Sequence, residues 1–405
     1  MSPLSFSAHK PYTSVALLDI GSTSVGAALV RLSEQTDGAF PPTVVWSRRK
    51  EIPFQQAVDS DHFFQRISGA LKAVLEAMST EAKESPQAFF CTFSSPWYAA
   101  QTRIAKSTFP QSSIITPQIV NSLVDAEAAA FEAAYASHMP AESSGRAALL
   151  EQKIMRVRLN GYAVEKPYGK SAQEVDVALY ISMSPQFFLD EVNRLVGEVF
   201  HRGIDQYHSL AFVSFSALRD IFPEREHFLM CDIGGEITDL SLVKNNLLVE
   251  TVSFPKGRMT LMRDAVSRLK RQPEEVLSML TLHFEGLRGE DALSPRLNEI
   301  IEQGRKEWLE AFYAAMTELR NRNFLAGDIE ITAHPLMRQW IGSALSSATP
   351  PLGAVGNVKL NPHFIDAPFL RTFVSFQDAA RQFDAFLGLE AVFAEKILNL
   401  AGKAV

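Results

Sequence analysis

Two segments that lie far apart in the chain share one pattern. LLDIGSTSVGAALV begins at Leu17, and MCDIGGEITDLSLV begins at Met230. Each reads as a buried strand, an Asp-Ile-Gly turn with small or hydroxyl residues, and a second apolar strand, which predicts a β-hairpin. A dinucleotide or P-loop motif would run from its glycines into a helix. A single glycine hairpin is a common structural turn, so it is the repetition that indicates a shared function.

The two turns contain residue types that suit phosphate and magnesium. Glycine lets backbone N–H groups crowd around phosphate oxygens, and hydroxyl groups add donors. Carboxylates at the strand ends are suited to hold Mg²⁺, mainly through its water molecules. We therefore expect Asp19 and Asp232 to organise the metal and to act in catalysis. The residues expected to grip the phosphates are Gly21, Ser22, Thr23, Gly234, Gly235 and Thr238.

Composition narrows the class of protein. The chain has 405 residues, 46% of them hydrophobic, which is enough for two or more domain-sized cores. Its net charge of -7 gives no global reason to expect nucleic acid as a partner. Cys91 and Cys231 lie in apolar runs, which predicts buried, reduced thiols in the cytosol. The sequence shows neither a signal peptide nor a membrane span, so we expect peripheral or indirect membrane contact.

The paired hairpins resemble those of the actin, hexokinase and heat-shock-chaperone ATPases, whose two related lobes each carry a phosphate hairpin. Within that superfamily the chain is most similar to the bacterial FtsA and PilM group of cell division and type IV pilus assembly. KIMRVRLNGYAVEKPYGK, followed by a strand ending in YISMSP, resembles the insert of that group. VSFPKGRMTLMRDAVSRL resembles the segment after its second hairpin, with motif positions at Gly257, Thr260, Asp264 and Ala265.

The resemblance implies an α/β, two-lobed actin-like ATPase fold with a strand-helix-strand-strand (SHS2-type) insert in the first lobe. It implies ATP and Mg²⁺ as cofactors, and it adds Gly257 and Thr332 to the expected nucleotide-binding residues. The implied domains are 13–85 for the first lobe with its hairpin, 86–190 for the insert, 191–257 for the second lobe with its hairpin, 258–325 for a helical subdomain, and 326–405 for the rest of the second lobe and the closing helix of the first.

Two places depart from the pattern of the superfamily. Ala333 and His334 stand where a glycine pair is expected, just before Pro335, which is suited to start a helix. A Cβ there should crowd adenosine or shift the turn, so we expect nucleotide binding without implying efficient hydrolysis. We expect His334 to be a turn or helix-start residue. Glu236 replaces a further glycine and is either a catalytic residue that orients water or reaches the metal, or a solvent-facing turn residue.

The resemblance implies an FtsA-type scaffold at the inner face of the cell membrane, which links the division machinery to the membrane and assembles under nucleotide control. A PilM-like role in pilus assembly is the first alternative. A small-molecule kinase on the same fold and a nucleotide-free scaffold are the others. Division or pilus proteins are the expected partners. A solvated strand face is the default interpretation of the basic insert residues, and binding of an acidic partner segment or of a neighbouring subunit in a filament is the alternative: Lys153, Arg156, Arg158, Lys166 and Lys170.

The last segment of the chain, FDAFLGLEAVFAEKILNLAGKAV, reads as the closing helix of the fold. Phe393, Ile397 and Leu400, with Lys396 and Lys403, are candidates for a weak membrane-binding face. Core packing of the same apolar residues is the favoured interpretation.

Overall fold

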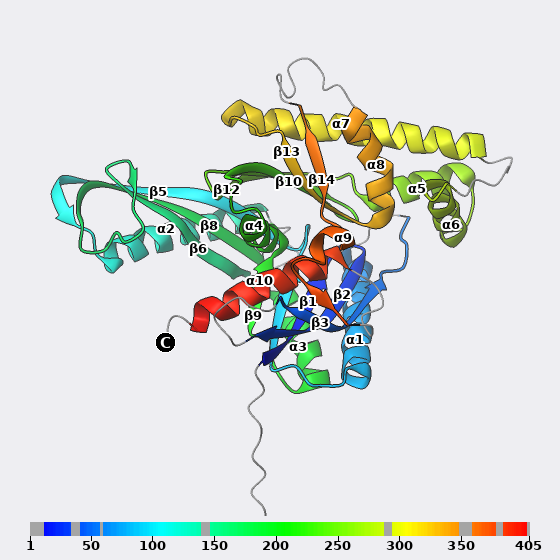
Figure 1. Ribbon diagram of the computed structural model, residues 1–405, viewed down its shortest axis with the longest axis horizontal. Coiled ribbons are helices and arrows are strands. Elements are labelled where there is room, and N and C mark those ends of the chain that lie inside the picture. Colours follow the sequence, from blue (N-terminus) through cyan, green and yellow to red (C-terminus); the bar gives the residue numbers. More distant parts are fainter. Residues whose placement is uncertain are drawn as a thin grey trace, which may run out of the picture.

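The computed structural model describes residues 12–33, 41–56, 60–138, 146–286, 294–347, 359–377 and 384–402. Within these ranges the strands form three sheets, one in each of two lobes and one in an insert that projects from them (Figure 1). Most of the N-terminal segment, in which we expect no signal peptide, lies outside the described residues.

The first lobe is built on a six-stranded sheet with the order β15-β3-β2-β1-β4-β9. β1 and β3 are each antiparallel to β2, whereas β4 runs parallel to β1 and β9 parallel to β4. The strands are β1 (Tyr12–Ile20), β2 (Ser24–Ser33), β3 (Thr43–Glu51), β4 (Ala88–Phe93), β9 (Gln206–Ser209) and β15 (Ser375–Phe376), and the helices are α1 (Ser60–Glu81), α3 (Gln186–Phe200) and α10 (Ala385–Gly402).

The residues of β1 explain why helices cover both faces of this sheet. Alternate side chains of a strand point to opposite faces. Ala16, Leu18 and Ile20 belong to the core under α1 and α3, while Val15 and Leu17 belong to the core under α10. Because both sets are apolar and buried, the strand is stable only with a packed layer on each side.

The second lobe is built on a five-stranded sheet with the order β12-β11-β10-β13-β14. Leu229 and Cys231 of β10 face one helical layer, and Phe228 and Met230 face the opposite layer, which contains α4. The elements are β10 (His227–Ile233), β11 (Thr238–Lys244), β12 (Leu247–Phe254), β13 (Asp328–Ala333), β14 (Asn361–Phe364), α4 (Leu210–Ile221), α5 (Arg258–Leu269), α6 (Pro273–Phe284), α7 (Ser294–Arg322), α8 (Pro335–Ser347) and α9 (Ala367–Leu370).

The two lobes repeat one topology. In each, an antiparallel hairpin and a third antiparallel strand are followed, on the other side of the hairpin's first strand, by two parallel strands. The order β3-β2-β1-β4-β9 thus corresponds to β12-β11-β10-β13-β14. Both Asp-Ile-Gly turns are therefore at equivalent places in the two lobes.

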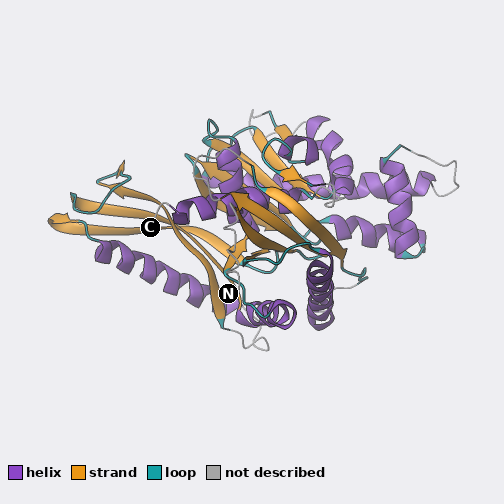
Figure 2. Cartoon of the chain, turned by 60° about the horizontal axis from the view of Figure 1, so that its bottom comes forward, coloured by secondary structure: helices purple, strands orange, loops and turns teal. Residues whose placement is uncertain are grey.

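The insert has its own antiparallel sheet, with the order β5-β8-β6-β7, and α2 packs on one face of it (Figure 2). In chain order it is a strand, a helix and further strands, so the α/β class, the two lobes and the strand-helix-strand-strand insert are confirmed. Its elements are β5 (Ala99–Ile114), α2 (Pro117–His138), β6 (Ala147–Leu159), β7 (Tyr162–Ala163) and β8 (Ser171–Pro185).

The pairing of the strands moves two of the expected domain boundaries. The range 86–190 was expected to be insert, but β4 within it pairs with β1 in the first lobe, and the separate sheet begins at Ala99. The range 191–257 was expected to be second lobe, but β9 within it pairs with β4. The apolar run AFFCTF of β4 suits the middle of a sheet that is covered on both faces.

The base of the insert contacts both lobes. The buried carboxylate of Glu151 on β6 accepts hydrogen bonds from the backbone N–H of Ser209 at 3.0 Å and from its hydroxyl at 2.6 Å, at the junction with the first lobe. The Thr102 hydroxyl on β5 donates to the Leu248 carbonyl on β12 of the second lobe. The insert is therefore held at its base rather than tethered by a linker.

The closing helix α10 is part of the core. Phe393 is 2% exposed and Ile397 packs against the same cluster, while Lys396 pairs with Asp220 of α4 at 2.7 Å. Phe393 and Ile397 thus pack in the core, as the favoured interpretation expected, rather than forming a membrane-binding face. The Leu400 side chain and Lys403 lie outside what the structure describes. Within the described ranges, no helix combines the length and apolar character needed to span a membrane.

Candidate functional site

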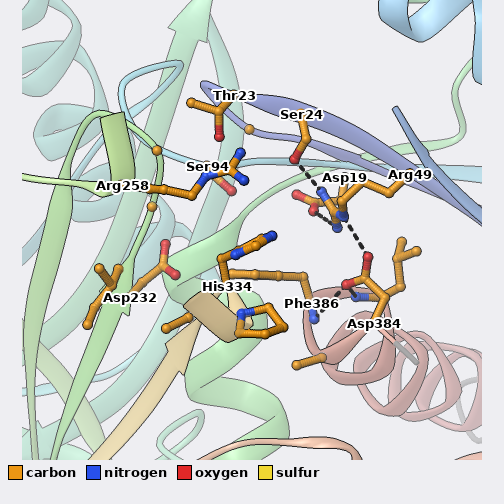
Figure 3. Close-up of a pocket in the computed structure, with 18 of the residues that line it drawn as sticks. Asp19, Thr23, Ser24, Arg49, Ser94, Asp232, Arg258, His334, Asp384 and Phe386 are labelled. Carbon is orange, nitrogen blue, oxygen red and sulfur yellow. Dashed lines mark hydrogen bonds and ion pairs between the residues drawn. The ribbon is translucent and has the colours of Figure 1, made fainter. Parts of the chain in front are cut away.

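A cleft of about 1130 Å³ lies between the lobes where the two hairpins meet (Figure 3). Its walls come from both hairpins, from the end of β3, from the turn between β13 and α8, and from the start of α10. Small-molecule sites usually enclose about 300–1,000 Å³. The cleft is therefore large enough for a nucleotide.

The first hairpin contributes Asp19, Gly21, Ser22 and Thr23 to the wall of the cleft, as expected from the motif. The turn is closed by the Gly21 N–H, which donates to the Ser24 carbonyl at 3.0 Å. Because that bond uses the Gly21 donor internally, the free backbone donors of this turn come from the residues that follow it.

The second hairpin contributes Asp232, Gly234 and Gly235. The N–H groups of Arg258 and Met259, in the first turn of α5, donate to the Gly234 and Gly235 carbonyls at 3.0 and 2.8 Å. The helix thus begins directly on the hairpin. It brings the Arg258 side chain to the wall of the cleft.

The two hairpins touch each other. The Glu236 N–H donates to the Ser22 hydroxyl at 3.1 Å. A Cβ added at Gly235 would lie 2.0 Å from the Thr23 side chain, well inside van der Waals contact. Glycine at 235 therefore permits the close approach of the lobes.

Arg49 of β3 occupies the space beside Asp19. Its guanidinium donates to Asp19 Oδ2 and to Asp384 Oδ2, each at 2.5 Å, and to the Ser24 hydroxyl at 2.9 Å (Figure 3). The Arg49 side chain is 18% exposed, and those of Asp19 and Asp384 are 3% and 13% exposed. Charge-assisted bonds of this kind are among the stronger hydrogen bonds in proteins.

A glycine on the neighbouring strand makes room for this guanidinium. Gly26 of β2 pairs across the sheet with Arg49. A Cβ added at Gly26 would lie 2.7 Å from Arg49 Nη2 and 2.9 Å from its central carbon. Any other residue at 26 would therefore push the guanidinium away from Asp19.

The ion pair stabilises the charged form of Arg49. Burial lowers the pKa of Arg49, but the carboxylates of Asp384 and Asp19 raise it by more, and the net shift is upward. Burial raises the pKa of Asp19, and Arg49 offsets part of that rise. The guanidinium is therefore a fixed positive charge at the base of the first hairpin.

Among the described residues, Asp232 has no such counter-charge. Its Oδ1 is buried without a hydrogen-bond partner. Burial raises the pKa of Asp232 well above its usual range, and the charges of Asp239 and Asp19 raise it further. Behind Asp232 lies a cavity of about 20 Å³, lined in part by Tyr98 and Thr332. That volume suits a single water molecule.

The turn after β13 carries Ala333 and His334 into the wall of the cleft. His334 begins α8: its Nδ1 accepts from the Leu336 N–H at 3.2 Å, and its carbonyl accepts from the Met337 N–H at 2.8 Å. Burial, followed by the nearby Arg258, lowers the pKa of His334 to about 4. The residue is therefore a neutral helix-start residue at neutral pH, in agreement with the sequence-based expectation.

Four expected residues are not part of the cleft wall. The Glu236 carboxylate pairs with Arg263. The Thr238 hydroxyl donates to the Lys256 carbonyl at 2.6 Å. Thr332 lines the small cavity behind Asp232, and Gly257 packs against the second hairpin, where a Cβ would lie 2.4 Å from the Gly235 carbonyl oxygen. These residues support the hairpin in this structure, and their proposed roles in binding or catalysis stay predictions.

Several residues of the cleft were not anticipated from the sequence: Ser24, Arg49, Ser94, Arg258, Arg338, Asp384 and Phe386. The run SRRKE that contains Arg49 reads as a solvated strand end. One signal was present, because a glycine inside a strand often marks the close approach of another group. Gly26 stands inside β2 in that way.

Magnesium does not fit Asp19 as predicted. Arg49 donates to one carboxylate oxygen of Asp19, and the other is buried without a hydrogen-bond partner, so the guanidinium takes the space beside Asp19 that a hydrated ion would need. Among the described residues, no group of three or more His, Cys, Asp or Glu side chains could hold a metal ion.

Two lobes of equivalent topology that meet at a pair of hairpins define the actin-like ATPase fold, and this chain has that fold. No protein-family model matches the sequence, and no curated protein matches it. Among solved structures, it is similar to a chain of the PilM-PilN type IV pilus biogenesis complex, with 15% identity and a TM-score of 0.63, covering 96% of this chain and 98% of that one.

Two further similarities are weaker. The ethanolamine utilization protein EutJ from Carboxydothermus hydrogenoformans has 12% identity and a TM-score of 0.40, covering 96% of this chain and 90% of that one. Component A of (R)-2-hydroxyglutaryl-CoA dehydratase from Acidaminococcus fermentans has 12% identity and a TM-score of 0.37, covering 95% and 99%. The resemblance to the PilM and FtsA group is confirmed at the level of the fold.

Proposed function

We propose that this protein is a PilM-type scaffold that binds ATP between its lobes and docks a pilus-assembly protein at the inner face of the cell membrane. The observation that supports this most is the similarity to PilM, which extends over nearly the whole of both chains, insert included. The FtsA-type division role was the first expectation. It has less support, because the similarity with a TM-score of 0.63 is to a chain of the PilM-PilN complex.

The cleft supports the nucleotide part of this proposal. It has the volume for a nucleotide, and two turns with glycines meet at one end of it. Arg258 and Arg338 place guanidinium groups in its wall, and guanidinium is well suited to bind phosphate. Each is paired with a carboxylate of the same wall, Glu51 and Asp366 respectively. Lobe closure around the nucleotide would change the surface that the protein presents to a partner.

A small-molecule kinase is the weaker candidate. Such an enzyme needs a base within reach of the acceptor hydroxyl. Glu236 was expected to orient water or reach the metal, or to be a turn residue, and its carboxylate is paired with Arg263 away from the cleft wall. Turnover of ATP with a panel of alcohols would establish a kinase and overturn the scaffold proposal.

Calorimetric titration of ATP into the purified protein tests the nucleotide part. Saturable binding is expected, and absence of binding at millimolar ATP would indicate a nucleotide-free scaffold. Deletion of the gene tests the cellular part. We expect loss of surface pili with normal division, whereas filamentous cells that retain their pili would favour the FtsA-type role. Self-assembly through the basic residues of the insert stays a prediction, to be checked by sedimentation of Arg156→Glu and Arg158→Glu variants.

A further inference from the structure

The first hairpin already contains a cation. Arg49 lies against Asp19, at the place where the sequence motif predicts a hydrated magnesium ion. All three guanidinium nitrogens donate hydrogen bonds: to Asp19, to Asp384 and to Ser24. The guanidinium also lies 5.6 Å from the centre of the Phe386 ring.

The structure around Arg49 favours this one position of the guanidinium. Gly26 leaves the space that the guanidinium fills. Asp384 is itself held in place, because its Oδ1 accepts from the N–H groups of Phe386 and Leu387 at 3.0 and 3.2 Å in the first turn of α10. A long side chain that is bonded at every nitrogen and anchored to a helix start is preorganised, so little is lost when an anion binds beside it.

Arg258 plays a similar part at the second hairpin. It is 6% exposed, it pairs with Glu51 of the first lobe, and it lines the same cleft (Figure 3). Each hairpin therefore has a guanidinium at its base, fixed by a carboxylate. The chain therefore places a guanidinium group beside each hairpin, in the wall of one cleft.

We propose that the cleft binds its nucleoside polyphosphate as the metal-free anion, with the Arg49 guanidinium standing where other proteins of this fold would place a divalent cation. This inference rests on the proposed nucleotide binding and specifies its ligand. It makes the protein a nucleotide sensor whose occupancy is independent of Mg²⁺. Without a metal to neutralise charge on the transferring phosphoryl group, the site binds ATP and does not hydrolyse it.

The test compares ATP titrations in MgCl₂ and in excess EDTA. ATP should bind the wild-type protein at least as tightly in EDTA as in MgCl₂. The electron paramagnetic resonance spectrum of Mn²⁺ with ATP should be the same with and without the protein. Binding that requires Mg²⁺ would overturn the inference and leave the proposed function intact. Absence of binding in both conditions would overturn both.

Two variants test whether Arg49 is the residue that makes ATP binding independent of Mg²⁺. In Arg49→Met/Asp384→Asn, which removes the guanidinium together with one of its two carboxylates, we expect ATP binding to become Mg²⁺-dependent by about tenfold. Lys50→Met, on an exposed neighbouring residue of the same strand, is the matched control. If both variants keep the wild-type response to Mg²⁺, Arg49 does not replace a metal.

A second variant covers the case in which the double substitution does not fold. Gly26→Ala displaces the guanidinium by steric contact and retains its charge. It should move the response to Mg²⁺ in the same direction by a smaller factor. An Mn²⁺ signal that the wild-type protein broadens and Asp232→Asn restores would place a metal at the second hairpin and contradict the inference.

Discussion

The two hairpins have equivalent strands but different charges on the neighbouring strands. In the first lobe, Asp19 lies across from Gly26, and Gly26 lies across from Arg49 on the third strand. This row of the sheet joins one carboxylate to one guanidinium across a glycine. Its charge is balanced within the sheet.

The equivalent row of the second lobe is unbalanced. Asp232 lies across from Asp239, and Asp239 lies across from Ser253. Asp239 stands at the place of Gly26, and Ser253 stands at the place of Arg49. Burial and the second carboxylate raise the pKa of Asp232. A repeated turn motif therefore determines geometry, while the neighbouring strands determine the charge at each copy.

The largest effect on stability is expected when Arg49 is removed from the charge-balanced row of the first lobe. Arg49→Met leaves Asp19 and Asp384 buried without their counter-charge and should lower the free energy of unfolding by about 3–5 kcal/mol. Urea denaturation at neutral pH measures it, with Lys50→Met as the control. A loss no greater than that of the control would show that the pair contributes nothing to stability.

The second expected effect concerns the neutral histidine of the second lobe. The pKa of His334 is lowered from 6.5 to about 4, so folding favours its neutral form. The stability this gives is present above pH 6.5 and is lost as pH falls through about 4. The control is His334→Asn, whose side-chain oxygen can also accept a hydrogen bond at a helix start. As pH falls from 6.5 to about 4, the free energy of unfolding of the wild type should drop by about 3 kcal/mol relative to this variant, as measured by urea denaturation. Parallel pH profiles would contradict the assignment.

The contact between the hairpins gives the third effect. Gly235→Ala places a methyl group against Thr23 and should cost about 1–3 kcal/mol of stability while separating the lobes. Thermal denaturation and X-ray scattering measure the two consequences. Adding Thr23→Ala to Gly235→Ala should restore both the stability and the spacing of the lobes. The control is Gly69→Ala in α1, where an added Cβ has no atom within 4 Å, and it should be neutral or stabilising. Failure of the second substitution to rescue would mean that the lobes do not meet at these residues.

The smallest effect on stability is expected at Asp232, in the unbalanced row of the second lobe. Because the pKa of Asp232 is raised in the folded state, its contribution to stability is full below pH 3.8 and is lost as pH rises towards the folded-state pKa. Asp232→Asn imitates the protonated acid and should exceed wild type by about 1 kcal/mol at neutral pH. Asp125→Asn, on an exposed residue of α2, is the control. Equal stability of wild type and Asp232→Asn from acid to neutral pH would show that Asp232 titrates normally.

The sequence was sufficient to predict both hairpins and the order of elements in the insert, because these depend on local patterns of apolar residues and glycines. The fold class followed from the family resemblance that the hairpins and the insert carry. It did not predict that β4 belongs to the first lobe, since the parallel pairing of Leu17 with Phe90 joins segments far apart in the chain. Arg49 was missed for a related reason. Its partner Asp384 lies near the other end of the chain, and a basic residue on a strand usually faces solvent.

The helix α10 connects this charge cluster with the opposite side of the protein. Asp384 precedes its first residue and pairs with Arg49, while Lys396, three turns further on, pairs with Asp220 of α4. An α-helix of 18 residues is about 27 Å long and behaves as a stiff rod over that length. A ligand that shifts Asp384 in the cleft would therefore move the Lys396–Asp220 contact with α4 through the same helix, without a change of fold.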